Sequence, residues 1–181
     1  MCRHVMKATL EDHAQGRFGA EITLVQYGDY ECPHTRRSLR SVRVLQRELA
    51  DRLLYVFRHF PLEEIHPHAR AAAAAAEAAG AQGEFWRMHA LLFEHQAALG
   101  ARDLHQYAVA IGLDPDRFER DRSSPETSVQ IDFSVSCGEQ SGVNKTPTFF
   151  INGRLHEGAY DVQTLRAAIA ENSAGSPLDR A

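Results

Sequence analysis

A strand that gives way to a helix at a cysteine is the feature that most constrains the fold of this chain. The run from Ile22 to Tyr27 is mostly apolar, as in a buried strand. Apolar residues with helical spacing follow it, at Leu39, Val42, Leu45 and Leu49. Cys32 lies between the two patterns, and Pro33 suits the first position of a helix, where a missing N–H costs nothing. We therefore expect Cys32 to cap the N-terminus of this helix.

This position predicts a reactive sulfur. Unpaired N–H groups and the positive end of the helix dipole favour a thiolate over a thiol. His34 strengthens this effect if it is protonated, or else it simply faces solvent. A dithiol redox motif has a second cysteine three residues after the first, but here that residue is Thr35. The Thr35 hydroxyl can support the thiolate or bond locally, and the sequence leaves both possibilities open.

Length and charge exclude several classes of partner. A chain of 181 residues favours one domain with a core of its own. Its 20 basic and 24 acidic residues give a formal charge of −4 without a long basic cluster, so we expect neither nucleic acid nor a membrane as partner. The N-terminus lacks the apolar segment of a signal peptide, and no apolar run is long enough to span a bilayer. We expect a cytoplasmic protein.

The three cysteines argue against a framework of structural disulfides. We expect Cys2 to be an incidental exposed thiol on a terminal arm. Cys137 lies in a segment whose apolar residues form no single stripe, and we expect a buried, inert thiol there. On this interpretation neither residue assists Cys32.

The remaining patterns predict a second strand, a helical segment and a final hairpin followed by a helix. The apolar run 53–57 has the character of a strand buried on both faces, and helical patterns fill about 67–140. Pro147 begins a strand that Asn152 and Gly153 turn back on itself. We expect a single domain over 1–181, with an N-terminal arm at 1–19, a core at about 20–66 and 141–172, a helical insertion at about 67–140 and a tail at 173–181.

Five stretches together resemble one protein family. They are Val25–His34, Phe57–Leu62, Ile65–Ala69, Phe85–His89 and Ser141–Gly153. With them the chain resembles the DsbA-like class of thioredoxin-fold oxidoreductases, in its compact cytoplasmic-type branch. The resemblance implies an α/β thioredoxin fold with a helical insertion and a central mixed sheet.

The resemblance also implies roles for individual residues. Cys32 matches the attacking cysteine of the family. Pro147 matches a proline that is cis and lies beside that cysteine, so we expect a cis Thr146–Pro147 bond. Pro33, Thr146 and Pro147 are therefore the expected substrate contacts, with Cys32, His34 and Thr35 as the catalytic set.

A single attacking cysteine predicts a monothiol enzyme. Cys32 can form a mixed disulfide, which an external thiol such as glutathione then releases. We expect a glutathione-linked reductase or transferase that acts on a disulfide-containing protein or small molecule and binds no cofactor. Two alternatives stay open: a peptide-binding or chaperone-like module without redox turnover, and a glutathione-dependent isomerase or transferase for small electrophiles.

Other polar residues near the motif receive simpler interpretations. Asp29 and Glu31 are expected as loop acids in solvent, since carboxylates close to the sulfur would oppose the thiolate. His59, His66 and His68 are candidate metal ligands by residue type. Their loop contributes no cysteine and lacks the close spacing of zinc ligands, so we expect no metal.

Overall fold

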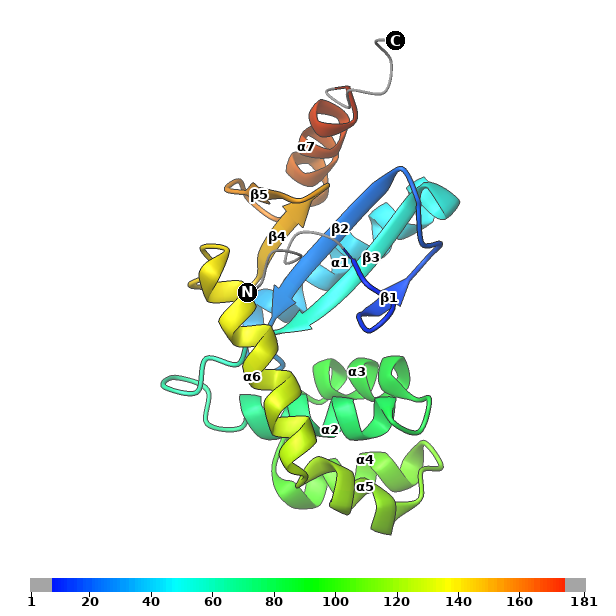
Figure 1. Ribbon diagram of the computed structural model, residues 1–181, viewed down its shortest axis with the longest axis vertical. Coiled ribbons are helices and arrows are strands. Elements are labelled where there is room, and N and C mark those ends of the chain that lie inside the picture. Colours follow the sequence, from blue (N-terminus) through cyan, green and yellow to red (C-terminus); the bar gives the residue numbers. More distant parts are fainter. Residues whose placement is uncertain (1–7, 175–181) are drawn as a thin grey trace. The chain divides into compact units, whose positions relative to one another are not determined.

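The computed structural model describes residues 8–174 of the chain (Figure 1). The described elements are β1 (His13–Gln15), β2 (Ile22–Gly28), α1 (Pro33–Leu49), the 3-10 helix η1 (Ala50–Arg52), β3 (Leu53–His59), α2 (Ala69–Gly80), α3 (Phe85–Glu94), α4 (Ala101–Ala110), α5 (Pro115–Arg122), α6 (Pro125–Gln140), β4 (Thr148–Ile151), β5 (Arg154–His156) and α7 (Val162–Ala174).

The described residues fall into two compact units. The first unit comprises 8–27, 37–58 and 147–174, and the second comprises 28–36 and 59–146. The first unit therefore contains the sheet, and the second contains the helices α2 to α6. The expected insertion at about 67–140 lies within the second unit, and so does the short segment that carries Cys32.

A five-stranded sheet with the order β1-β3-β2-β4-β5 forms the first unit. β1 pairs antiparallel with β3, and β4 pairs antiparallel with both β2 and β5. The arrows of β2 and β3 point the same way in Figure 1, so the sheet is mixed. Val25 and Phe150 are partners in the β2–β4 register, and both are almost completely buried. The predicted α/β class with a central mixed sheet is confirmed.

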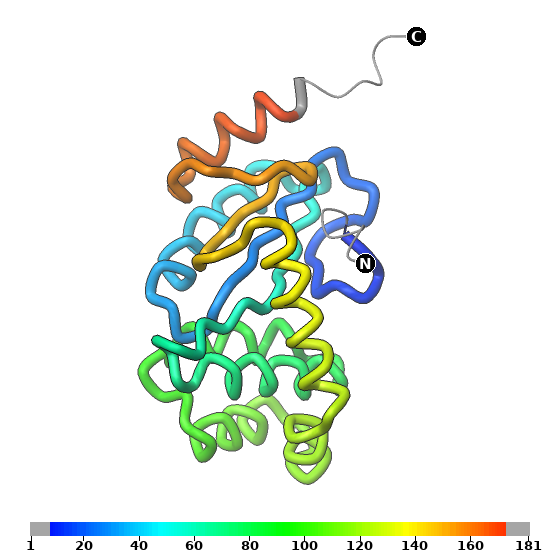
Figure 2. The backbone as a smooth tube through the Cα atoms, turned by 60° about the vertical axis from the view of Figure 1, so that its left-hand side comes forward, coloured from blue at the N-terminus to red at the C-terminus, as the bar shows by residue number. Residues whose placement is uncertain are grey.

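The sheet unit contains α7 and the part of α1 from Arg37 onward. The apolar spacing of α1 predicted its buried face, and Leu39, Val42 and Leu45 are indeed buried. α7 follows the β4–β5 hairpin along the chain, as Figure 2 shows in red and orange, and it contacts β4. It continues to Ala174, so the tail expected from Ser173 begins later than predicted. The rest of that tail and residues 1–7 lie outside the described part.

The expected N-terminal arm at 1–19 contains a strand, β1, that the sequence did not indicate. His13–Gln15 pairs antiparallel with β3, with His13 opposite Phe57. The strand is only three residues long, which is too short for an alternating pattern to be recognised in the sequence. Gly16 ends it with a φ of +106°, and a Cβ there would lie 2.2 Å from the Leu53 carbonyl oxygen. Only glycine fits this position without a backbone shift.

The helices of the second unit begin where the capping signals predict. Asp114 caps α5 by accepting a hydrogen bond from the Arg117 N–H at 2.9 Å. Ser124 caps α6 in the same way through the Thr127 N–H at 3.1 Å. α4 begins at Ala101, directly after Gly100. No helix within 8–174 combines the length and apolar character needed to cross a bilayer.

α2 is the alanine-rich helix around which the second unit packs. It contacts α3, α4, α5 and α6. Nearly all of its alanines are buried, because their small side chains allow neighbouring helices to approach closely. Glu77 is the buried carboxylate of this helix, and it lies 2.8 Å from Nε2 of His59. The alanine run is therefore a packed helix, which agrees with the high helix propensity of alanine.

Candidate active site

Cys32 occupies the turn between the end of β2 and the start of α1. The strand ends at Gly28 and the helix begins at Pro33. The Arg36 N–H donates to the Cys32 carbonyl at 3.2 Å, which is the first hydrogen bond of the helix. Cys32 is therefore the capping residue, and its side chain lies at the positive end of the helix dipole.

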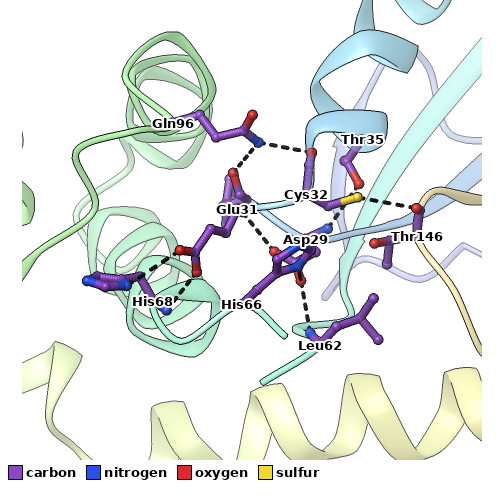
Figure 3. A network of polar contacts seen from close by, with 10 residues as sticks. Asp29, Glu31, Cys32, Thr35, Leu62, His66, His68, Gln96 and Thr146 are labelled. Atoms are coloured by element: carbon purple, nitrogen blue, oxygen red, sulfur yellow. Dashed lines mark hydrogen bonds and ion pairs between the residues drawn. The ribbon is translucent and has the colours of Figure 1, made fainter. Parts of the chain in front are cut away.

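The sulfur of Cys32 is nearly buried and has a defined partner. Cys32 is 4% exposed and is a free cysteine. Its thiol donates a hydrogen bond to the Thr146 carbonyl oxygen, with 3.3 Å between sulfur and oxygen (Figure 3). Thr146 was an expected substrate contact, and the structure places its backbone directly against the sulfur. Its own hydroxyl is buried and has no hydrogen-bond partner among the described residues.

The other expected site residues differ in exposure. Pro33 and His34 are exposed in the first turn of α1. Pro147 is buried directly before β4, and the cis form of the Thr146–Pro147 bond stays a prediction. Thr35 is completely buried, and its hydroxyl accepts a hydrogen bond from the Asp29 N–H at 3.4 Å. This bond connects the first turn of α1 to the loop before it, so the local hydrogen bond that the sequence left open is present.

Asp29 is not the solvated loop acid that we expected. It is 1% exposed, and its carboxylate accepts hydrogen bonds from the N–H groups of Glu31 at 2.7 Å and Leu62 at 2.9 Å. Nδ1 of His66 lies 2.8 Å from the same carboxylate. A buried carboxylate needs such donors to offset the loss of water. Asp29 therefore holds the motif against the segment that follows β3.

Glu31 also departs from the expectation of a solvated acid. It is only partly exposed and accepts a hydrogen bond from the His68 N–H at 2.7 Å. Nδ1 of His68 lies 3.5 Å from its other carboxylate oxygen. The three histidines considered as metal ligands thus each contact a carboxylate, since His59 contacts Glu77 and His66 contacts Asp29.

Gln96 is a site residue that the sequence did not indicate. It lies between α3 and α4, and its Nε2 is 2.6 Å from the Tyr30 carbonyl oxygen and 2.9 Å from the Cys32 carbonyl oxygen (Figure 3). Nearby, the Arg36 guanidinium donates to the Glu94 carbonyl at 3.5 Å. These contacts join positions about sixty residues apart in the chain. No local pattern could have revealed them.

The expectation for Cys137 is half right. Its side chain is buried in α6, as predicted. It is not a free thiol, however, because it is disulfide-bonded. Cys2, expected as an incidental thiol, lies outside the described residues. Cys32 is therefore the free cysteine of the part that the structure describes.

The model of a family described as thioredoxin matches residues 8–171, which is nearly all of the chain. The chain belongs to this thioredoxin family. A thioredoxin-like oxidoreductase from Silicibacter pomeroyi DSS-3 has a similar structure, with a TM-score of 0.85, 25% identity and coverage of 96% of this chain and 99% of that one. DsbA2 of Pseudomonas aeruginosa has a TM-score of 0.75 and 26% identity, with coverage of 93% and 98%. The thioredoxin-family chain thus has the DsbA-like fold that its sequence predicted.

Relatives with higher identity carry a different name. A protein of Salinispora arenicola named Na(+)/H(+) antiporter NhaA 1 is 44% identical over 167 residues, which are 92% of this chain and 26% of that protein. A protein of Herminiimonas arsenicoxydans named Na(+)/H(+) antiporter NhaA is 38% identical over 165 residues, again 26% of its length. The thioredoxin-family chain therefore spans about a quarter of the length of these curated relatives.

Proposed function

We propose that this protein performs thiol–disulfide exchange with Cys32 as its single attacking thiol. The observation that carries the proposal is the pair of residues at the start of α1. A free cysteine stands at the helix cap, and a buried threonine, Thr35, stands where a second thiol would be. The DsbA-like fold supports the class of reaction, and Thr35 supports the monothiol form of it.

The exchange proceeds in two balanced steps. Cys32 first loses to solvent the proton that it donates to the Thr146 carbonyl. Its thiolate then attacks one sulfur of a disulfide R–S–S–R′, so that a Cys32–S–S–R bond forms and R′–S⁻ leaves. An external thiolate attacks the R sulfur, forms a new disulfide with R and returns Cys32 to its thiolate form.

Glutathione is the external thiol that we propose for the second step. No second cysteine of the motif is present to attack the mixed disulfide, so its release depends on a thiol from solution. The disulfide substrate is a protein or a small molecule, and the backbone of Thr146 supports an extended peptide because its carbonyl oxygen lies beside the sulfur. Glutathione is abundant in a reducing cytoplasm, which is the compartment we propose.

Intact mass spectrometry after incubation with glutathione disulfide tests this function. We expect one glutathione adduct on Cys32, its removal by reduced glutathione, and no adduct at that position in Cys32→Ser. In a peptide-disulfide reduction assay the rate should then rise with the concentration of glutathione. A Cys32 that stays unmodified under these conditions would instead favour the peptide-binding module. An adduct formed only with small electrophiles would favour the glutathione transferase.

A second candidate function comes from the relatives named antiporters. The matched region makes up 26% of such a relative at 44% identity, so a homologous segment exists within proteins of that name. We propose that a sodium–proton antiporter is the partner of this domain and that Cys32 exchanges with a disulfide of the antiporter. This candidate specifies a partner for the exchange reaction and leaves its chemistry unchanged.

Proteoliposomes that contain a purified sodium–proton antiporter provide the test. Sodium-driven proton movement is measured with the parent protein, with Cys32→Ser and with neither, after the antiporter has been oxidised. The candidate predicts a change in transport with the parent only. Equal transport in all three preparations would rule out an exchange-dependent partnership.

A further inference from the structure

One nitrogen atom of the second unit reaches the backbone at Cys32 and directly before it, at Tyr30. Nε2 of Gln96 lies 2.6 Å from the Tyr30 carbonyl oxygen and 2.9 Å from the Cys32 carbonyl oxygen. An amide NH₂ group carries two N–H donors, so each carbonyl receives one of them. Gln96 is partly buried, which shields both bonds from competition with water.

The peptide unit between Tyr30 and Glu31 is held at both of its polar ends. Gln96 donates to its carbonyl oxygen, and its N–H donates to Oδ1 of Asp29 at 2.7 Å. The Asp29 carboxylate is itself held by the Leu62 N–H and by His66. This peptide unit therefore cannot rotate without breaking hydrogen bonds at two separate points.

The Cys32 carbonyl receives two donors as well. The Arg36 N–H contributes the first hydrogen bond of α1, and Gln96 contributes the second. A carbonyl oxygen carries partial negative charge, which opposes a thiolate on the same residue. Hydrogen-bond donors that point at this oxygen reduce its repulsion of the thiolate. They also fix the orientation of the N–H groups in the first turn of the helix.

We propose that Gln96 is a positioning residue for the reaction of Cys32. It acts through the backbone of Tyr30 and Cys32 and does not touch the reacting sulfur. The proposal deepens the exchange function proposed above and rests on it. It assigns a role in the reactivity of the motif to a residue of the helical unit that the sequence pattern did not single out.

The isosteric variant Gln96→Glu is the sharpest test. A carboxylate of the same size replaces the donor by an acceptor, which repels both carbonyls. The rate at which iodoacetamide alkylates Cys32, followed on the peptide that carries it, should fall about tenfold, the equivalent of one lost hydrogen bond. The alkylation profile should also move to higher pH, a shift that a purely structural role would not produce. Asp29, Glu31, His66 and His68 are unchanged in this variant.

Gln82 provides a matched control in the same unit. Its Nε2 donates to the Asp114 carbonyl at 3.3 Å, and its Oε1 accepts from the Asp114 N–H at 2.9 Å. Gln82→Glu therefore makes the same chemical change at another backbone contact. We expect its alkylation rate and pH profile to match those of the parent.

A third variant covers the case in which Gln96→Glu does not fold. Gln96→Ala removes the donor without adding charge and should slow alkylation in the same direction, with circular dichroism confirming the fold. Unchanged alkylation in the folded Gln96 variants, or equal slowing in Gln82→Glu, would overturn the proposal. Alkylation that responds to Gln96 in a protein that forms no glutathione adduct would refute the proposed exchange while leaving the positioning role standing.

Discussion

At the residue scale, Thr35 is the position on which the proposed monothiol reaction of Cys32 depends. Its side chain is completely buried, and its hydroxyl accepts the Asp29 N–H at 3.4 Å. Threonine therefore contributes a hydrogen bond between loop and helix at the position where a second sulfur would attack a mixed disulfide. The segment Cys32–Thr35 therefore contains one sulfur, that of Cys32, and a hydroxyl in place of a second one.

The substitution Thr35→Cys should supply that partner. A thiol fixed near the mixed disulfide acts at an effective concentration of about one molar or more, far above millimolar glutathione, so adducts on Cys32 should be released at least about a hundredfold faster. The lifetime of a glutathione adduct, followed by mass spectrometry, measures this effect. Thr35→Val is the control and should show no acceleration. Adducts that persist equally in Thr35→Cys would mean that Cys32 is badly placed for exchange.

Thr146 and Thr127 offer a matched pair for a stability prediction. Both are 8% exposed, but the Thr127 hydroxyl donates to the Asp121 carbonyl at 2.8 Å whereas the Thr146 hydroxyl has no partner among the described residues. Thr127→Val should lower the free energy of unfolding by about 1 kcal/mol. Thr146→Val should leave it unchanged or raise it by about 1 kcal/mol, because a buried unpaired hydroxyl is destabilising. Urea denaturation distinguishes these outcomes, and equal losses in both variants would contradict the prediction.

The sequence predicted the position of Cys32 at the start of a helix but not the residues that hold the segment around it. Cys32 was recognisable because its signals are local, namely a strand before it and Pro33 after it. Asp29 and Gln96 depend on partners far along the chain, such as Leu62 for the carboxylate. Nothing in a single sequence reports such a pairing, so the burial of Asp29 could not be foreseen.

At the scale of elements, prediction worked where an element is long or capped. α5 and α6 begin at prolines behind Asp114 and Ser124, and both caps form as expected. β1 was missed because a strand of three residues is too short to show a periodicity and pairs with a distant part of the chain. The helical segments were therefore predictable from local chemistry, whereas the edge of the sheet was not.

Gly16 and Gly19 give a test of how β1 is held in place. Both have positive φ, +106° and +82°, but only Gly16 has the Leu53 backbone where a Cβ would go. Gly19→Ala should cost about 1–2 kcal/mol for the left-handed backbone alone. Gly16→Ala should cost more, because the Leu53 carbonyl must also move. Thermal unfolding of the two variants measures the difference, and equal losses would show that the close approach is readily relieved.

At the scale of the whole molecule, the division into two units predicts which destabilising substitutions make Cys32 accessible to alkylation. Leu104 lies in the second unit and Leu165 in the first, and both are completely buried. Replacing either by alanine should cost about 2–5 kcal/mol of unfolding free energy. In mild urea, Leu104→Ala should expose Cys32 to alkylation sooner than Leu165→Ala, because the segment 28–36 belongs to the second unit. Identical alkylation at matched stability would mean that the chain opens as one cooperative body.

Because residues 28–36 belong to the helical unit, a chimera of two such proteins is expected to behave differently according to which parent supplies that unit. A chimera that keeps the Cys32–Thr35 tetrapeptide but takes residues 59–146, with their helices, from a homologue would lose Gln96 as a partner of the Cys32 carbonyl. It would also lose His66 and His68 as partners of Asp29 and Glu31. Its thiol chemistry would then follow the donor of the helices and not the donor of the tetrapeptide. The positioning role proposed for Gln96 therefore predicts that the reactivity of Cys32 is inherited with a discontinuous set of residues, and not with the tetrapeptide alone.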